Sequence, residues 1–311
     1  MTSQIQIYPN DLTEIDMSHL IDELRMQVRT IPQPVSDDVS AGISEWMKNC
    51  YRLRELILLG NPEKFLRWDV LLHTMVVTSP PYMSVELNSL LTLPEWATRW
   101  QTAVAEPQMG WPLPFPAYPA SSGNLLHQAY HLSQFEKSTK LRIDQMEYIF
   151  EFGGGYGSMA HLCHALGFRG KYVIFDFPIF SALQTFYLKA LGYSMLESAE
   201  AFQREYEGIF CMSDIDQLEE VLPLGEDIDP GLFIATWSLS ETPFELRQKF
   251  LSQMDLFHAY LFAYQDSFEK RDNFQYFEKW RQRLVGFESK SWPIKHLPAN
   301  YYMMGKRGIN I

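Results

Sequence analysis

A run of four glycines within ten residues is the feature that most constrains this chain. The segment YIFEFGGGYG at 148–157 begins with apolar residues typical of a buried strand, and the following SMAHLCHALG has the apolar spacing of a helix. Glycine is required where the backbone takes unusual dihedral angles or where a ligand approaches the main chain. A helix start adds unpaired N–H groups and the positive end of a dipole. A strand, a glycine turn and a helix in this order predict a nucleotide-binding edge of an open α/β sheet.

The second half of the chain alternates short apolar segments with helical ones. We predict buried strands at 148–152, 171–175, 209–212, 232–236 and 260–264. Helical spacing is found at 158–166, 179–191, 215–222, 244–257 and 273–284. The segments 289–295 and 301–306 flank a turn and predict a terminal antiparallel pair. The predicted fold class is therefore α/β, with a Rossmann-like sheet of five parallel strands plus that pair.

The first half has helical rather than alternating character. Trp46, Cys50, Leu53 and Ile57 recur at three- and four-residue steps, and a further amphipathic helix is predicted at 125–135. We predict a helical N-terminal cap at 1–140 that binds the acceptor, and a cofactor-binding domain at 141–311. The aromatic-rich helices of the first half could equally form the interface of a homodimer.

The composition excludes several classes of protein. Hydrophobic residues make up 46% and charged residues 21% of the 311, which is typical of a chain with a globular core and not of a disordered or fibrous one. The 26 Lys and Arg against 38 Asp and Glu give a formal charge of −12, which argues against nucleic-acid and anionic-membrane partners. Three scattered cysteines, no visible secretory signal and no apolar run of about 20 residues predict a cytoplasmic protein.

The glycine run fits two kinds of ligand. GYGSMA at 155–160 matches the GxGxxA fingerprint of dinucleotide-binding proteins. Glu151, Gly153, Gly155 and Gly157 instead match the acidic-x-GxGxG signature of S-adenosylmethionine (SAM) methyltransferases. A carboxylate two residues before the first glycine suits the cationic amino-acid end of SAM, whereas it would repel a pyrophosphate. We therefore favour SAM as the cofactor and include Tyr156 of the same loop in its site.

Later strand ends extend the predicted cofactor site. Asp176 ends the second strand, 19 residues after the last glycine of the run. There a carboxylate can accept hydrogen bonds from both ribose hydroxyls. Alternatively, its negative charge can stabilise the N-terminus of the helix that begins near Pro178. Ser213 and Asp214 end the third strand, where either could bind the adenine amine or start a helix. Thr236 ends the fourth strand and completes the set.

Four segments carry a family resemblance. They are LLHQAYHLSQF at 125–135, IFEFGGGYG, VIFDFPIFSALQTFYL and LFIATWSLSETP. In this order they resemble the helix before the glycine loop, the glycine loop, the D-x-P segment and the fourth-strand end of the sugar O-methyltransferase group of class I methyltransferases. The resemblance spans roughly residues 120–265 and implies a SAM-dependent enzyme that acts on a sugar or glycoside hydroxyl. Thr236 and Trp237 stand where the family more often has Asn- or Asp-type residues.

Methyl transfer to a hydroxyl needs a base that takes up the hydroxyl proton. The strand ends supply two carboxylates, Glu241 after the fourth strand and Asp266 after the fifth, and His296 lies in the link between the last two strands. Each has a structural alternative. Glu241 could complement the helix that a capping box at 242–245 would start, with proline at its first position. Asp266 could be a loop charge, and His296 a solvated histidine.

The acceptor site is expected beyond the carboxyl ends of the strands. Two hydroxyls follow the fourth strand, and two histidines one helical turn apart flank a tyrosine in the helix before the glycine loop. The predicted acceptor-binding residues are His127, Tyr130, His131, Trp237, Ser238 and Ser240. His161 and His164 follow the glycine run without an HExxH pattern, so we predict no metal there.

The predicted function is SAM-dependent methyl transfer to a hydroxyl of a small polar acceptor. Two alternatives stay open. One is an NAD(P)-dependent oxidoreductase that uses the GYGSMA loop. The other is a non-catalytic SAM-binding module whose helical segment mediates assembly.

Overall fold

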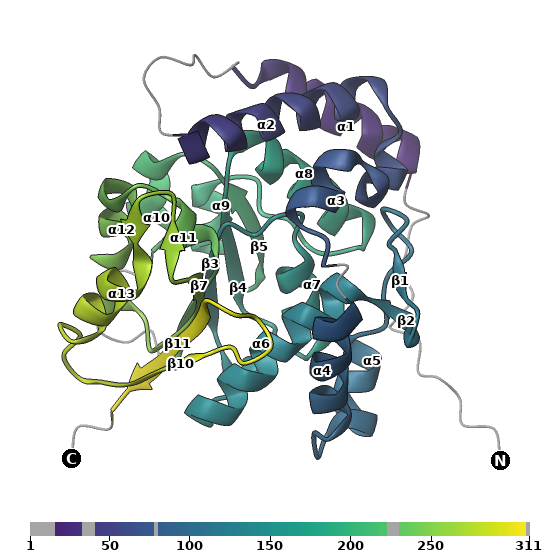
Figure 1. Ribbon diagram of the computed structural model, residues 1–311. Helices are drawn as coiled ribbons and strands as arrows, with labels where there is room; N and C mark the ends of the chain where they lie inside the picture. The colour runs from purple at the N-terminus through teal and green to yellow at the C-terminus, as the bar shows by residue number, and fades with distance from the viewer. Residues whose placement is uncertain (1–15, 33–40, 78–79, 223–229, 309–311) are drawn as a thin grey trace.

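A seven-stranded sheet forms the centre of the molecule (Figure 1). The computed structural model describes residues 16–32, 41–77, 80–222 and 230–308. The strands, in their order across the sheet, are β10 (Phe287–Pro293), β11 (Asn300–Arg307), β7 (Ala259–Gln265), β6 (Gly231–Thr236), β3 (Tyr148–Phe152), β4 (Lys171–Phe175) and β5 (Gly208–Met212). Strands β3 to β7 run parallel, whereas β11 is antiparallel to both β7 and β10. The predicted sheet of five parallel strands with a terminal antiparallel pair is confirmed.

Helices cover both faces of this sheet. One face is packed by α6 (Gly123–Thr139), α7 (Ser158–Ala165) and α8 (Pro178–Ala190). The other face is packed by α9 (Ala199–Arg204), α10 (Leu218–Val221), α12 (Phe244–Leu251) and α13 (Asn273–Arg281). All five residues of β3 are buried, with Ile149 facing the first group of helices and Phe150 the second. A strand that is covered by helices on both faces needs apolar side chains on both, which is why the parallel strands are nearly continuous apolar runs.

The position of β3 determines where a ligand can bind. β3 lies between β4 and β6. The chain therefore crosses to one side of β3 to form β4 and later to the opposite side to form β6. The carboxyl end of β3 is thus the point at which the winding reverses, where open α/β sheets bind their ligands. The glycine run follows β3 at this point.

The N-terminal helices lie against the α7 and α8 side of the sheet. α1 (Met17–Thr30) and α2 (Ala41–Leu59) pack on α8 and cross the upper end of the molecule in Figure 1. α4 (Pro80–Leu91) packs against α6, which also contacts α7 and β11. The remaining elements of this half are a 3-10 helix (Pro62–Arg67), α3 (Asp69–Thr74), a π-helix (Trp96–Trp100), α5 (Gln101–Ala103), β1 (Pro114–Phe115) and β2 (Tyr118–Ser122).

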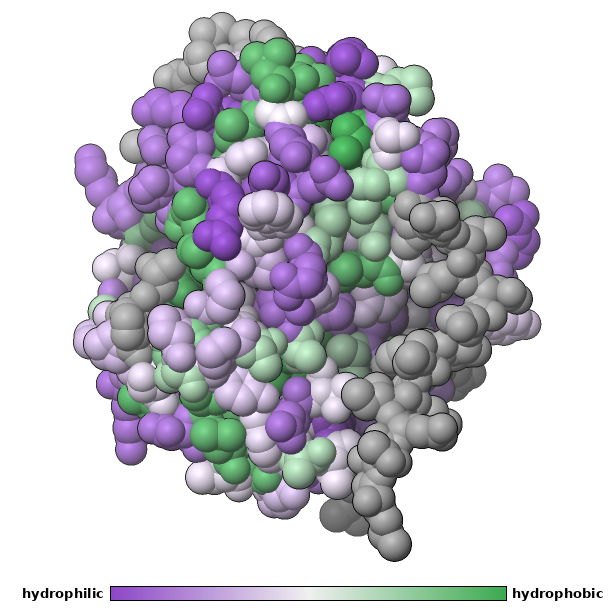
Figure 2. Space-filling model, turned by 90° about the vertical axis from the view of Figure 1, so that its right-hand side faces the viewer, coloured by the Kyte–Doolittle hydropathy of each residue, from purple (hydrophilic) through white to green (hydrophobic). Residues whose placement is uncertain are grey.

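The surface over these helices is mostly polar. On the face that Figure 2 shows, hydrophobic residues form small groups separated by hydrophilic ones. No helix in the described part of the chain is long and apolar enough to span a membrane.

Two predicted helices differ in detail from the observed ones. The segment predicted as one helix at 244–257 is α12 followed by a separate 3-10 helix (Met254–Leu256). Met254 and Phe257 still join the same apolar cluster as α12, so the spacing of apolar residues persists although the helix is interrupted. The segment 215–222 likewise begins as a 3-10 turn (Ile215–Gln217) before α10. The short helices α9 and α11 (Ser238–Glu241) and the hairpin of β8 (Ser267–Phe268) with β9 (Arg271–Asp272) were not predicted.

Candidate functional site

The glycine run forms a tight loop between β3 and α7. Gly153 and Gly155 have φ angles of +76° and +60°, in the left-handed region that glycine occupies without strain. A Cβ atom on Gly153 would lie 2.3 Å from Cβ of Ser238, and one on Gly155 would lie 2.5 Å from Sδ of Met75. The loop therefore needs glycine both for its backbone angles and for the closeness of its neighbours.

Asp176, at the end of β4, contacts this loop directly. One carboxylate oxygen, Oδ2, accepts hydrogen bonds from the Gly155 N–H at 3.1 Å and from Nε2 of Gln184 at 2.9 Å. The other oxygen accepts the N–H of Phe177 at 2.8 Å. Burial raises the pKa of Asp176 to about 7, although these hydrogen bonds oppose the shift. The structure thus brings together two predicted cofactor residues, and the ribose contact of Asp176 stays a prediction.

Glu151 lies beneath the same loop. Its side chain is buried, and Oε2 accepts a hydrogen bond from the Tyr172 hydroxyl at 2.9 Å. Burial raises the pKa of Glu151 to about 8, the charge of Asp176 adds to the rise, and the bond from Tyr172 opposes it. Neither Glu151 nor Asp176 forms an ion pair with a lysine or arginine of the described residues. Two carboxyl groups therefore lie near one loop without a cationic partner.

The other predicted cofactor residues lie in different surroundings. The Tyr156 ring is buried against Phe65, and its hydroxyl accepts a hydrogen bond from Asn124 at 2.8 Å, so the side chain fixes the loop from behind. Asp214 is exposed and accepts the N–H of Asp216 at 3.0 Å, which makes it the cap of the following turn. Ser213 follows β5 and Thr236 ends β6, both partly exposed.

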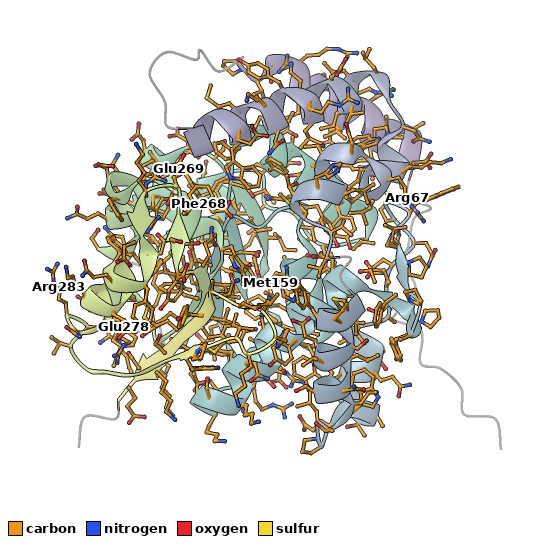
Figure 3. The ribbon with its side chains drawn as sticks, viewed as in Figure 1. Arg67, Met159, Phe268, Glu269, Glu278 and Arg283 are labelled. Atoms are coloured by element: carbon orange, nitrogen blue, oxygen red, sulfur yellow. The ribbon has the colours of Figure 1, made fainter. Side chains whose placement is uncertain are left out.

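Figure 3 shows the contrast between the interior and the rim of the molecule. Met159, in the first turn of α7, lies near the middle, whereas Arg67, Glu278 and Arg283 lie at the periphery. Met159 is buried, and it belongs to the same apolar cluster as the helices around the glycine loop. The first turn of α7 is therefore anchored in the core directly after the loop.

The end of β6 touches the glycine loop. Trp237 has a φ angle of +64°, and the chain then turns into α11. The Ser238 hydroxyl donates to the carbonyl oxygen of Phe152, and the buried Ser240 hydroxyl donates to the carbonyl oxygen of Trp237 at 2.6 Å. Ser238 thus bonds to the backbone directly before the loop and Ser240 to the backbone of its own turn, while their predicted contact with an acceptor stays a prediction.

Glu241 is held by the N-terminal helices. Its Oε2 accepts the indole N–H of Trp46 on α2 at 3.0 Å, and burial raises its pKa. The predicted capping box after it is wrong. Pro243 is the N-cap of α12 rather than its first residue, and the Thr242 hydroxyl donates instead to the carbonyl oxygen of Leu239 at 2.9 Å. The backbone of Pro243 is extended, with φ −61° and ψ 152°, so the helix begins one residue later than predicted.

α2 and α3 reach over the carboxyl edge of the sheet. The Trp46 ring stacks on Phe177, one residue after Asp176, with centroids 6.4 Å apart. Met75, directly after α3, lies against Gly155. The first half of the chain thus covers the loop from outside, which is where a bound ligand would need protection from water.

Asp266, the second predicted base, follows β7. Its Oδ1 accepts the Ser267 hydroxyl at 2.9 Å, and the residue lines an open cavity together with Arg271 and Tyr301. No hydrogen bond in the described part of the chain joins Asp266 to the glycine loop or to Glu241.

His127, His131 and His296 come together around a residue that the sequence analysis missed. Glu86 on α4 is fully buried, and its carboxylate accepts hydrogen bonds from Nδ1 of His127 at 2.8 Å and from Nε2 of His296 at 2.7 Å. The rings of His127 and His131 are 4.1 Å apart, and Tyr130 lies edge-on to His296 at 5.2 Å. We call Glu86, His127, His131 and His296 the histidine cluster.

Trp237 closes one side of the histidine cluster. Its ring stacks on His127 with centroids 5.4 Å apart and lies 5.3 Å from His131. The indole N–H donates to Oδ1 of Asn300 at 2.6 Å, which holds the ring in place. Four predicted acceptor residues, His127, Tyr130, His131 and Trp237, are therefore neighbours.

Glu86 had one sequence signal. It occupies the apolar side of α4 beside Met83, Leu87 and Leu90, which are all buried. A charged residue on such a side is seldom fully buried unless it is paired. The partners come from elements far along the chain, so the signal points to a buried pair without identifying it.

The two histidines after the glycine run serve other contacts. Nδ1 of His161 bonds to the Tyr193 hydroxyl at 2.8 Å, and Nδ1 of His164 bonds to the carbonyl oxygen of Ala160 at 2.9 Å. Among the described residues, no group of three or more His, Cys, Asp or Glu side chains is arranged to hold a metal ion.

The chain was compared with known proteins in three ways. No family model matches it, and no curated protein matches it. Several solved structures do. The methyltransferase domain of bacterial CtHen1-C is 9% identical, with a TM-score of 0.39 over 60% of this chain and 98% of that one.

Two other solved structures differ in how much they cover. MtNAS, as a mutant in complex with S-adenosylmethionine, is 11% identical with a TM-score of 0.38 over 93% of this chain and 97% of that one. A chain of the Pnkp1/Rnl/Hen1 RNA repair complex is 12% identical with a TM-score of 0.38, over 58% of this chain. This chain spans only 40% of that one.

Proposed function

We propose that this protein is a SAM-dependent methyltransferase that methylates a hydroxyl of a small polar acceptor, a sugar or glycoside. The observation that carries the proposal is a pair of carboxyl groups, the buried Glu151 and the partly exposed Asp176, placed around a left-handed glycine loop without a cationic partner among the described residues. Such a pair is unfavourable by itself, because burial and mutual repulsion both raise the pKa values. A cationic ligand would offset that cost.

SAM fits this arrangement better than a dinucleotide does. It carries a sulfonium and an α-amino group, both positive, together with a ribose that offers two hydroxyls. Glu151 would hold the amino-acid end and Asp176 the ribose, while the glycine loop would let the ligand approach the backbone. A pyrophosphate would instead bring negative charge to two carboxyl groups.

When bound, SAM supplies a methyl group already activated for transfer to a nucleophile. The chain's own residues then have to orient the acceptor, exclude water and accept a proton. Trp46 and Met75 cover the loop, which would exclude water from the cofactor side. Glu241, Asp266 and His296 stay candidates for the base, and the histidine cluster, which contains His296, has the partners to move a proton.

The aromatic character of the acceptor side supports a sugar. Trp237 and Tyr130 offer flat faces and the histidines offer hydrogen bonds, a combination that suits a ring with several hydroxyls. The net charge of −12 disfavours a nucleic-acid acceptor. We also propose that residues 1–140 select the acceptor and that 141–311 bind the cofactor.

The test uses methyl-labelled SAM and a panel of methyl hexopyranosides with the full chain. The expected result is a labelled, alkali-stable ether on at least one glycoside, formed by the wild type and lost in Gly153→Ala. Label found only in added RNA, or oxidation of an added alcohol with NAD, would contradict the proposal.

A further inference from the structure

We infer that His127 is the base that takes the proton from the acceptor hydroxyl, that Glu86 is its positioning residue, and that His131 donates a hydrogen bond to the same oxygen. This inference rests on the proposed function and specifies its acceptor side. It concerns an uncharged hydroxyl, since Glu86 is the charged member of the cluster and no lysine or arginine of the described residues pairs with it.

The hydrogen bonds of Glu86 determine where the proton of the His127 ring sits. Burial acts to raise the pKa of Glu86, but the bonds from His127 and His296 outweigh it, so the pKa is lowered and the group is a carboxylate. A carboxylate only accepts hydrogen bonds, so Nδ1 of His127 must carry a hydrogen. In the neutral ring the other nitrogen, Nε2, then holds the lone pair. Among the described residues it has no hydrogen-bond partner.

The neighbouring His131 has the complementary nitrogen. Its Nδ1 bonds to the hydroxyl of Tyr302, and burial raises the pKa of Tyr302 well above 10.0, so the phenol keeps a proton that it can donate to Nδ1. Burial lowers the pKa of His131, so its ring is neutral, and with Tyr302 as the donor its hydrogen lies on Nε2. That Nε2 is buried and has no partner among the described residues. A buried donor without a partner costs about 1–3 kcal/mol.

Together the two rings present a lone pair and an N–H group side by side. The rings are neighbours, with centroids 4.1 Å apart and planes at 71°, and we place one acceptor hydroxyl between the two nitrogens. Its oxygen would accept the N–H of His131, and its hydrogen would point to Nε2 of His127. This is the combination that recognises a hydroxyl and rejects a carboxylate or phosphate, neither of which offers a hydrogen when ionised.

The cluster lies beside the glycine loop. One turn before His127, Nδ2 of Asn124 bonds to the Tyr156 hydroxyl at 2.8 Å and to the Ser158 hydroxyl at 3.2 Å, on either side of the last glycine. On the opposite side, Trp237 stacks on His127 and precedes Ser238, which bonds to the residue before the first glycine. Two independent contacts thus place His127 next to the proposed cofactor site.

The proton step balances within the cluster. The O–H bond of the acceptor breaks and an N–H bond forms at Nε2 of His127, which turns the neutral ring into an imidazolium. The negative charge of Glu86, 2.8 Å from Nδ1, stabilises that cation, and the electron pair left on oxygen becomes the nucleophile. The imidazolium then returns its proton to water.

The first test is the ¹⁵N spectrum of the full chain with labelled histidines. We expect His127 to be the tautomer with hydrogen on Nδ1, and we expect that preference to be lost in Glu86→Gln, whose amide can donate as well as accept. Finding the hydrogen of His127 on Nε2 in the wild type would overturn the inference. His73, exposed on α3 and bonded to the carbonyl oxygen of Asp69, supplies the matched control variant His73→Asn.

The second test separates this inference from the proposed function. His127→Asn should lower methyl transfer to the glycoside panel by about 10²–10⁴-fold, while calorimetry shows unchanged affinity for the demethylated cofactor. His73→Asn should leave both unchanged. A rate of methyl transfer by His127→Asn within threefold of the wild-type rate would refute the role of His127 as the base, although cofactor binding and the proposed function would still hold. Failure of the wild type to bind the demethylated cofactor would refute the proposed function instead.

Discussion

Glu86 and Glu151 are both buried glutamates, yet their surroundings shift their pKa values in opposite directions. Glu86 accepts hydrogen bonds from two imidazoles, and its pKa is lowered. Glu151 accepts one bond from a phenol and lies near the carboxyl group of Asp176, and its pKa is raised to about 8. Both side chains are almost without exposure, so burial does not explain the difference. The partners do.

The difference separates a carboxylate that is balanced by imidazole groups of the chain from a carboxyl group that has no charged partner among the described residues. The charge of Glu86 is matched by groups of the chain itself. In the described part of the chain, the carboxyl group of Glu151 is paired with one neutral hydroxyl, that of Tyr172, and its neighbour Asp176 has the same sign of charge. In the proposed function, a cationic cofactor pairs with the carboxyl groups of Glu151 and Asp176.

The largest effect is expected from removing the matched carboxylate. Glu86→Ala leaves two imidazole N–H groups without an acceptor in the core, each at a cost of about 1–3 kcal/mol in the free energy of unfolding. Glu151→Gln has the shape of the protonated acid and should change that free energy by less than about 1 kcal/mol at pH 4.5, where the folded chain keeps Glu151 protonated and Glu86 ionised. Urea unfolding measures both. Equal losses in the two variants would erase the distinction between the regions.

The pH dependence of stability should have opposite signs at the two sites. The pKa of Glu151 rises from 4.5 to about 8 on folding, so within this window the folded chain holds a proton that the unfolded chain has lost. Its contribution to the free energy of unfolding therefore decreases as the pH rises through the window. Glu86 has a lowered pKa, so its contribution is present above pH 4.5 and is lost as the pH falls through the folded-state value.

The measurement is urea unfolding as a function of pH in three proteins. Compared with the wild type, Glu151→Gln should remove a decline between about pH 5 and 8. Glu86→Gln should reduce the loss at the acid end. Parallel curves for the two variants would show that their partners do not control these carboxyl groups.

A smaller effect is expected at the glycine loop, where a matched pair is available. Gly153 and Gly286 have φ angles of +76° and +77°, so alanine costs about 1–2 kcal/mol of backbone strain at either position. Only at Gly153 would the new Cβ meet a neighbour, Ser238 at 2.3 Å, whereas nothing lies within 4 Å at Gly286. Gly153→Ala should therefore weaken binding of the demethylated cofactor at least tenfold in calorimetry. Equal affinities of Gly153→Ala and Gly286→Ala for the demethylated cofactor would show that the loop is not part of the binding site.

The smallest effect is expected from removing the Tyr172 hydroxyl, which donates a hydrogen bond to Glu151. Tyr172→Phe removes the 2.9 Å bond to Glu151, at a cost of about 0.5–1.5 kcal/mol. Because that bond lowers the pKa of Glu151, its loss should raise the pKa further, which a side-chain ¹³C titration would detect. Tyr264→Phe, which loses only a 3.3 Å contact with Ser291, is the control and should leave the titration unchanged.

The same two regions show what sequence reasoning can reach. The strands, the glycine loop, Glu151 and Asp176 follow from local rules, because a strand, its turn and the next strand end lie within 29 residues, 148–176. The histidine cluster does not. Glu86 is 41 residues from His127 and 210 from His296, and no local pattern joins positions so far apart.

Local spacing did identify part of that cluster. His127 and His131 lie one turn apart on α6, which is why they were predicted to act together. Their partner on α4 could not be predicted, because it depends on how α4 packs on α6 and how the β10–β11 link folds over both. Predicted helix ends were less accurate for a similar reason, since burial of Met254 and Phe257 does not require an unbroken helix.

The central claim is that the glycine loop with its two carboxyl groups, Glu151 and Asp176, binds SAM. A calorimetric titration of the full chain at pH 7 with SAM, its demethylated product and NAD tests it most directly. We predict saturable binding of one SAM or one demethylated cofactor per chain, and no heat of binding with NAD. Saturable binding of NAD without a response to SAM would contradict the claim.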